Sequence, residues 1–119
     1  MSRILVVEDE ALIASMIEEW LGELGCISVG PAATVASAMA LIDQAPPDGV
    51  ILDVSLGRET SFAIADRLTT IGVPFAFATG YSDSTLPSRF VGSLTLSKPF
   101  DFDALGRVIT AFATGRSSV

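Results

Sequence analysis

The stretch Gly49-Val50-Ile51-Leu52-Asp53 decides the fold, because an uninterrupted apolar run there ends abruptly in a carboxylate. A short apolar run without alternating polar residues is typical of a strand whose two faces are both buried. Pro46-Pro47 stands just before it and ends the helical pattern that precedes the run. We therefore predict a buried strand over residues 50–52 that ends at Asp53.

Four further apolar runs alternate with segments of helical spacing. They predict strands at residues 4–7, 26–30, 73–78 and 94–97. The helical spacing predicts helices that begin near Leu12, Thr34, Ser61 and Asp101. Leu12 and Ile71 are expected on the buried faces of the first and third of these helices. The stretch Ser82 to Phe90 has little helix propensity, so only a short or mobile helix is expected there.

Five strands that alternate with helices predict an α/β fold, with a parallel sheet covered by helices on both faces. With right-handed crossovers, a (βα)5 chain fits the flavodoxin-like strand order 2-1-3-4-5. A sheet buried on both faces also accounts for an apolar content of 50% and a mean hydropathy of +0.56. We expect a single domain over residues 1–119, with a polar tail from about residue 114.

Composition argues against several classes of function. The net charge of −7 is unsuited to nucleic acid, because binding a phosphate backbone needs clustered cationic side chains. No apolar stretch of about eighteen residues exists, so no membrane span is predicted. The lone cysteine, Cys26, fits a reducing compartment, and we expect a cytoplasmic protein. Histidine is absent, so chemistry must use carboxylates, hydroxyls and the single lysine, Lys98.

Polar residues end four of the five predicted strands. Glu8 and Asp9 follow the first strand, and Asp53, Thr79 and Lys98 end or follow the third, fourth and fifth. Taken alone, each has an ordinary structural explanation: a helix cap for Asp9, a turn for Asp53 or Thr79, and solvation for Lys98. In the order 2-1-3-4-5, however, these four strands are contiguous, and ligands of open α/β sheets bind at this edge. We therefore expect these side chains to form one site.

Three carboxylates brought together must hold either protons or a cation. Oxygen ligands without Cys or His favour a hard ion, and a shell completed by water favours Mg²⁺, with Mn²⁺ as the alternative. A cation would keep Asp53 ionised as a nucleophile for phosphorus, while Thr79 and Lys98 each hold one phosphoryl oxygen. The residues thus predict phosphoryl transfer to Asp53.

Two other uses of this fold agree less well with the residues. Flavin mononucleotide binding requires a Ser-, Thr- or Gly-rich phosphate loop after the first strand, where this chain has Glu8-Asp9-Glu10. A haloacid-dehalogenase-type phosphatase would need a second carboxylate two residues after its nucleophile, where this chain has Ser55.

The sequence resembles a response-regulator receiver domain over essentially its whole length. The residues that carry the resemblance are Ile4-Leu5-Val6-Val7-Glu8-Asp9-Glu10, Asp53, Thr79-Gly80 and Lys98-Pro99-Phe100. The resemblance implies that Asp53 is the phosphoacceptor, that Asp9 and Asp53 bind Mg²⁺ directly, and that Glu8 acts mostly through water. It also implies a metal ligand from the backbone carbonyl of Ser55 and a cis peptide bond between Lys98 and Pro99.

The segment Phe77-Ala78-Thr79-Gly80-Tyr81 resembles more narrowly the FATGUY receivers, which are often stand-alone domains. Receivers usually carry a switching Tyr or Phe three residues before the lysine, but this chain has Thr95 there. Thr95 is too small to swing between buried and exposed positions as a ring does. We therefore expect the signal to pass through Thr79, Tyr81 and the segment from Ser82 to Phe90.

The expected function is two-component phosphorelay signalling. The resemblance implies a histidine kinase or histidine phosphotransfer protein as donor and a downstream protein that the sequence does not identify, and it leaves a homodimer open. No enzyme activity is expected beyond phosphorylation and dephosphorylation of the domain's own aspartate. The alternatives are a pseudo-receiver that never turns over phosphate and a phosphatase for an external substrate. The complete set of Asp9, Asp53, Thr79 and Lys98 argues against a pseudo-receiver.

Overall fold

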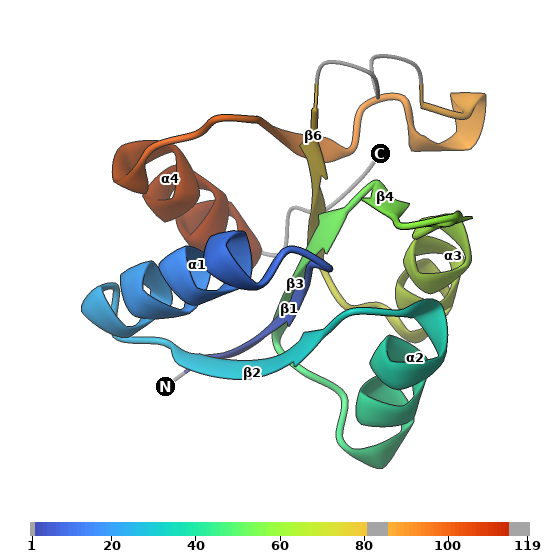
Figure 1. Cartoon of the computed structure of the whole chain (residues 1–119), viewed down its shortest axis with the longest axis horizontal. Helices are drawn as coiled ribbons and strands as arrows, with labels where there is room; N and C mark the ends of the chain where they lie inside the picture. The colour runs from blue at the N-terminus through green and yellow to red at the C-terminus, as the bar shows by residue number, and fades with distance from the viewer. Residues whose placement is uncertain (1, 81–85, 115–119) are drawn as a thin grey trace.

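A five-stranded parallel sheet lies at the centre of the protein (Figure 1). The computed structural model describes residues 2–80 and 86–114. The strands are β1 (Arg3–Val7), β2 (Ile27–Ala32), β3 (Gly49–Asp53), β6 (Phe75–Thr79) and β7 (Leu94–Ser97). They are ordered β2-β1-β3-β6-β7, which is the predicted order 2-1-3-4-5 when these five strands are counted along the chain. The predicted fold class is therefore confirmed.

Helices cover both faces of this sheet. One face carries α1 (Ala11–Glu23) and α4 (Phe102–Ala113), and the other carries α2 (Val35–Gln44) and α3 (Phe62–Ile71) (Figure 1). Side chains alternate along each strand, so neighbours in the sequence serve different cores. Leu5 and Leu52 pack toward α2 and α3, whereas Ile4 and Ile51 pack toward α1 and α4. Burial on both faces explains why the strands are apolar without alternation.

Two residues that were expected in the core are exposed. Leu12 is 88% exposed, because the buried stripe of α1 runs through Ala14, Ile17 and Leu21 and leaves Leu12 outside it. Ile71 is 40% exposed, because it is the last residue of α3 and the chain turns away at the following residue. The two predictions were wrong for different reasons: Leu12 lies outside the packed stripe of its helix, and Ile71 lies where its helix ends.

A short antiparallel hairpin follows the central strand and was not predicted. It pairs β4 (Ser55–Leu56) with β5 (Glu59–Thr60), and Gly57 in its two-residue turn has a φ of +64°, a value that favours glycine. The Glu59 side chain accepts a hydrogen bond from the backbone N–H of Val35 at 3.3 Å, which ties the hairpin to the start of α2. The hairpin begins two residues after Asp53, so its position bears directly on the site.

The segment expected to form a short helix contains a single 3₁₀ turn, η2 (Ser88–Phe90), among its described residues. Its first part, residues 82–85, lies outside the described residues. Phe90 is buried beside three other phenylalanine rings and Leu86 packs against the same core, so these two side chains attach the described part of the segment.

The start of α2 is closed by a capping box, as the sequence predicted for Thr34. The Thr34 hydroxyl accepts from the backbone N–H of Ser37 at 3.1 Å, and the Ser37 hydroxyl accepts from the N–H of Thr34 at 3.2 Å. Removing this hydroxyl in Thr34→Ala should lower the free energy of unfolding by about 1 kcal/mol. Urea unfolding followed by Trp20 fluorescence measures the change. Thr70→Ala, inside α3, is the control and should be close to neutral; equal losses in both variants would contradict the role of the cap.

Candidate functional site

The site lies at the carboxyl ends of β1, β3, β6 and β7. Asp53 is the last residue of β3 and is 5% exposed. Thr79 ends β6 and is half-buried, and its carbonyl accepts a hydrogen bond from the N–H of Lys98 at 2.8 Å. A cavity of about 330 Å³ opens at this edge, lined by Asp9, Glu10, Asp53, Ser55, Gly57, Gly80 and Lys98. The structure thus brings together the strand-end residues that the sequence predicted.

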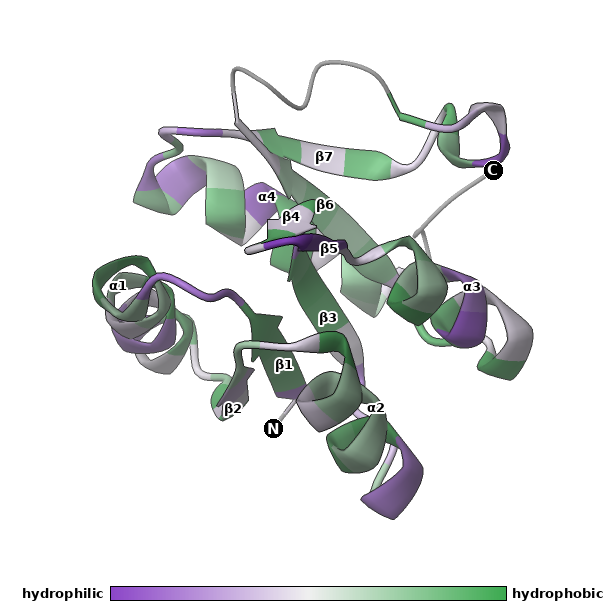
Figure 2. Cartoon of the chain, turned by 45° about the vertical axis from the view of Figure 1, so that its right-hand side comes forward, coloured by the Kyte–Doolittle hydropathy of each residue, from purple (hydrophilic) through white to green (hydrophobic). Residues whose placement is uncertain are grey.

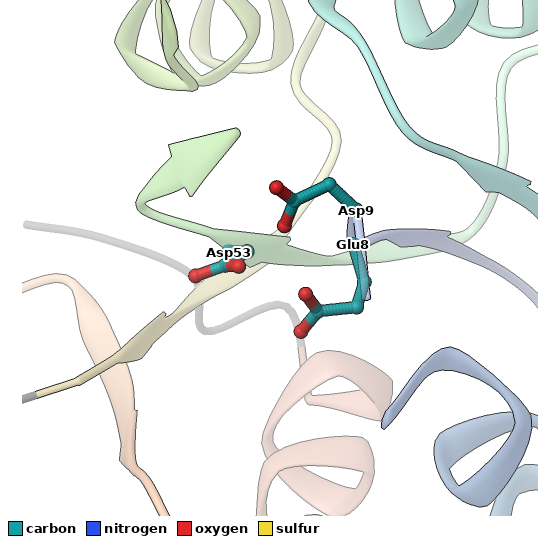
Figure 3. Close-up of side chains that lie close together, drawn as sticks. All are labelled: Glu8, Asp9 and Asp53. Carbon is teal, nitrogen blue, oxygen red and sulfur yellow. The ribbon is translucent and has the colours of Figure 1, made fainter. Parts of the chain in front are cut away.

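Three carboxyl groups meet in this site. Oxygen atoms of Glu8, Asp9 and Asp53 lie within 4.8 Å of one another, at the ends of β1 and β3 (Figure 3). Glu8 and Asp53 are buried, whereas Asp9 is exposed. The interpretation of Asp9 as a helix cap is wrong, because the N-cap position of α1 is occupied by Glu10. Asp9 is therefore left facing the cavity.

Lys98 is held between two of these carboxylates. Its ammonium nitrogen lies 3.0 Å from Oε1 of Glu8 and 3.2 Å from Oδ2 of Asp53. Burial alone would lower the pKa of Lys98, but the hydrogen bond to Glu8 and the charge of Asp53 outweigh it and raise that pKa above its usual value. Lys98 is therefore a fixed positive charge at any physiological pH.

The environment of Asp53 works against its ionisation. Burial raises the pKa of Asp53 most, and the adjacent Glu8 raises it further, while Lys98 lowers it. The balance raises the pKa of Asp53 to about 7. Without a further cation, the Asp53 carboxyl is thus only partly ionised near neutral pH.

Sequence reasoning missed how Glu8 is used. Glu8 is only 3% exposed; besides Lys98, it accepts a hydrogen bond from the backbone N–H of Glu10 at 3.1 Å. It therefore fixes the position of the lysine as well as contributing to the acidic cluster. Two features of the sequence could have indicated that Glu8 pairs with Lys98: the chain has one lysine, and Glu8 directly follows a buried strand.

The remaining predicted residues are placed as follows. Ser55 begins β4 and lines the cavity, and Thr95 is exposed on the edge strand β7. Tyr81, the expected switch residue, lies outside the described residues. The peptide bond between Lys98 and Pro99 is cis, as the resemblance implied, and the bond between Gly30 and Pro31 is also cis.

A family model agrees with this geometry: the response regulator receiver domain matches residues 4–110. The chain belongs to the response regulator receiver domain family. SdrG from Sphingomonas melonis Fr1, solved in solution, is 42% identical, with a TM-score of 0.85 over 95% of this chain and 97% of that one. The BeF3-activated conformation of SdrG is 44% identical, with a TM-score of 0.78 over 92% and 93% of the two chains.

Curated relatives are longer than this chain. The sensory transduction protein LytT of Bacillus subtilis is 32% identical over 94% of this chain and 48% of its own length. The chain spans about half the length of the curated relatives it matches first. Receiver domains act in two-component phosphorelay signalling, and this is the class of function to which the domain belongs. Within the described part of the chain, helices are too short or too polar to cross a membrane.

The raised pKa of Asp53 predicts a pH dependence of stability in metal-free protein. The unfolded carboxyl ionises near its usual pKa of 3.8, whereas the folded protein holds the proton until about pH 7. The stability that this proton contributes is therefore complete below the lower value and is lost as the pH rises to the upper one. In EDTA, the free energy of unfolding from urea titrations should fall as the pH rises from about 4 to about 7.

Asp53→Asn tests the origin of that loss, because asparagine stays neutral throughout. This variant should be more stable than the wild type, by a margin that is larger at pH 8 than at pH 5. Asp103→Asn, an exposed position in the first turn of α4, is the control and should follow the wild-type curve. Parallel curves for the wild type and Asp53→Asn would show that Asp53 is not the titrating group.

Proposed function

We propose that Asp53 accepts a phosphoryl group from a histidine kinase or a histidine phosphotransfer protein, within one receiver domain formed by residues 1–119. The observation that supports this most directly is a buried carboxyl at the end of the central strand, 3.2 Å from a lysine and beside two further acids. A buried acid so placed is costly for folding, and Asp53 lines the cavity at the carboxyl ends of the strands.

The proposed step is an in-line displacement at phosphorus. An Oδ atom of Asp53 forms the new bond to phosphorus while the bond to the donor's leaving group breaks, and the leaving group departs with the electron pair. From acetyl phosphate the leaving group is acetate, so no further reactant is needed. Lys98 lies 3.2 Å from Asp53, and its raised pKa keeps it positively charged, which suits it to bind a phosphoryl oxygen. The Thr79 hydroxyl at the end of β6 is the proposed partner of a second oxygen.

The donor set fits a hard divalent cation. Its members are carboxylate oxygens within 4.8 Å of one another, among the described residues, and one lysine does not neutralise three acids. Asp9 and Asp53 are the proposed direct ligands of Mg²⁺ or Mn²⁺, together with the backbone carbonyl of Ser55. Glu8, which also holds Lys98, is proposed to act on the cation mostly through water, as the resemblance to receiver domains implies. A bound Mg²⁺ supplies charge neutralisation, which lowers the cost of ionising Asp53.

An apolar surface beside Lys98 supports a protein as the donor. A cavity of about 350 Å³ is lined by Ile13, Met16, Gly80, Lys98, Pro99 and Phe100. Leu12, one helical turn before Met16, is almost fully exposed. An exposed apolar strip next to an acceptor suits the helices of a kinase or phosphotransfer protein. We assign the docking of that donor to this surface of α1.

The readout is proposed to run from Thr79 to η2. Phe77 lies two residues before Thr79 in β6, and its ring centroid is 5.2 Å from that of Phe90 in η2. Phe62, the first residue of α3, packs on both rings at 6.0 and 5.7 Å. These rings supply a contact path from the end of β6 to η2, and Thr95 lies beside Phe77 on the neighbouring strand β7. Tyr81 retains its proposed role as part of this path, leading toward an unidentified downstream protein.

Incubation with acetyl phosphate and Mg²⁺ tests the acceptor directly. Intact-mass measurement should show the gain of one phosphoryl group that is lost on mild alkaline treatment. Asp53→Asn should abolish the gain, EDTA should suppress it, and the exposed control Asp103→Asn should behave as the wild type. Stoichiometric phosphorylation of Asp53→Asn would refute the assignment. No gain in the wild type with either acetyl phosphate or a phosphorylated kinase would favour a pseudo-receiver.

Asp9→Ala tests the cation site. Removing one of few protein ligands should weaken Mg²⁺ binding by about tenfold or more, as measured by isothermal titration calorimetry. Glu23→Ala, an exposed acid at the far end of α1, is the control for the change in net charge. Equal Mg²⁺ affinity in the Asp9→Ala variant and the control would remove Asp9 from the ligand set.

A further inference from the structure

The β4–β5 hairpin places an arginine at the rim of the acceptor cavity. Gly57 lines the cavity together with Asp53, and Arg58 is the next residue in the two-residue turn. Figure 2 shows the β5 end of this hairpin as strongly hydrophilic. No function assigned so far uses Arg58.

The cavity itself has an unfavourable charge for an anionic substrate. Asp9, Glu10 and Asp53 line it and Glu8 lies behind them, whereas Lys98 is the one cationic side chain in its lining. The ammonium of Lys98 is already shared between two carboxylates at 3.0 and 3.2 Å. A donor phosphoryl group carries about two negative charges near neutral pH, so it is repelled on approach until further positive charge is supplied.

Arg58 has the positive charge that the rim lacks, and nothing in the described residues holds it elsewhere. Its side chain is exposed and has no ion pair or hydrogen bond there. Two other surface arginines differ: Arg67 is paired with Asp43, and Arg89 makes two hydrogen bonds to Asp66 at 2.9 and 3.1 Å. Arg107 is also exposed, but it lines a different cavity, so Arg58 is distinguished by its place beside Gly57 at the cavity that contains Asp53.

We propose that Arg58 binds the phosphoryl group of the incoming donor and holds it over the cavity for attack by Asp53. The planar guanidinium offers two parallel N–H donors to two phosphoryl oxygens, a geometry that a lysine does not reproduce. This inference rests on the proposed phosphoryl transfer, and it adds the residue that recognises the substrate. Because the contact is to the phosphoryl group, it applies to donors with different leaving groups.

Removal of the Arg58 side chain should leave the hairpin in place. The ladder pairs Ser55 with Thr60 and Leu56 with Glu59, Leu56 is buried, and Glu59 is bonded to the start of α2. Arg58 belongs to none of these contacts. A change in donor binding in Arg58→Ala therefore reports on the guanidinium rather than on the fold.

The test compares phosphorylation kinetics with two small donors, acetyl phosphate and phosphoramidate, in excess Mg²⁺. In Arg58→Ala, the half-saturating concentration of both donors should rise about fivefold, the size of one solvent-exposed ion pair. The maximal rate and the Mg²⁺ affinity measured by calorimetry should stay at wild-type values. Arg58→Lys should recover part of the loss. Arg107→Ala removes the same charge from a different cavity, between β7 and α4, and should match the wild type.

Three results would overturn the inference. Equal half-saturating concentrations in Arg58→Ala and the wild type would show that Arg58 does not bind the donor. A higher half-saturating concentration for acetyl phosphate alone would show that Arg58 contacts the leaving group and not the phosphoryl group. An equal rise in Arg107→Ala would show that the effect comes from net charge alone. If the wild type gains no phosphoryl group from either small donor or a phosphorylated kinase, the proposed function fails and this inference fails with it.

Discussion

The ammonium of Lys98 lies between the carboxylates of Glu8 and Asp53, and the arrangement of the whole acceptor edge depends on this shared ion pair. Glu8 follows β1 and Lys98 follows β7, so the contact spans β3 and β6 and ties together four strand ends. Both carboxylates are buried, and an uncompensated buried charge is strongly destabilising. Burial and the adjacent Glu8 together outweigh Lys98 and raise the pKa of Asp53 to about 7, and one lysine does not neutralise three acids. The same excess charge that weakens the fold is what a divalent cation would relieve.

Most of the fold could be predicted because its signals are local. Apolar runs without alternation mark strands buried on both faces, and helical spacing between them leaves the order 2-1-3-4-5 as the simplest arrangement. The β4–β5 hairpin escaped prediction because Ser55-Leu56-Gly57-Arg58-Glu59-Thr60 is short and mostly polar, and its strands contain two residues each. Leu12 was wrongly predicted to be buried, because the helical spacing of apolar residues does not show where a helix stops contacting the sheet.

The site could be predicted as a set of residues, but its internal contacts could not. Parallel strands end at one edge, so the meeting of Asp9, Asp53, Thr79 and Lys98 follows from topology alone. That Glu8 is the closer partner of Lys98 depends on how side chains pack at this edge, where Glu8 is only 3% exposed, and no local sequence pattern links two residues that are 90 positions apart. The cap interpretation of Asp9 failed by one residue, since α1 begins at Ala11 and its N-cap is Glu10. Small shifts of this kind decide whether an acid caps a helix or faces a cavity.

The two elements that flank Asp53, the β4–β5 hairpin and β6, both lead to aromatic rings that pack on Phe90. On one side, the hairpin leads through Ser61 into Phe62 at the start of α3; on the other, Phe77 leads to Thr79 at the end of β6. Both rings pack on Phe90, so a displacement on either side of the acceptor reaches η2 through the same cluster. The anchorage of η2 is slight: one buried ring and the exposed Arg89–Asp66 pair, an interaction of small net stability. Weak anchorage is typical of segments whose alternative positions lie close in free energy, which is why the proposed readout is assigned to η2. Thr95, exposed on β7, pairs in register with Phe77, so the edge strand beside this cluster carries a small side chain where a ring would add to the packing.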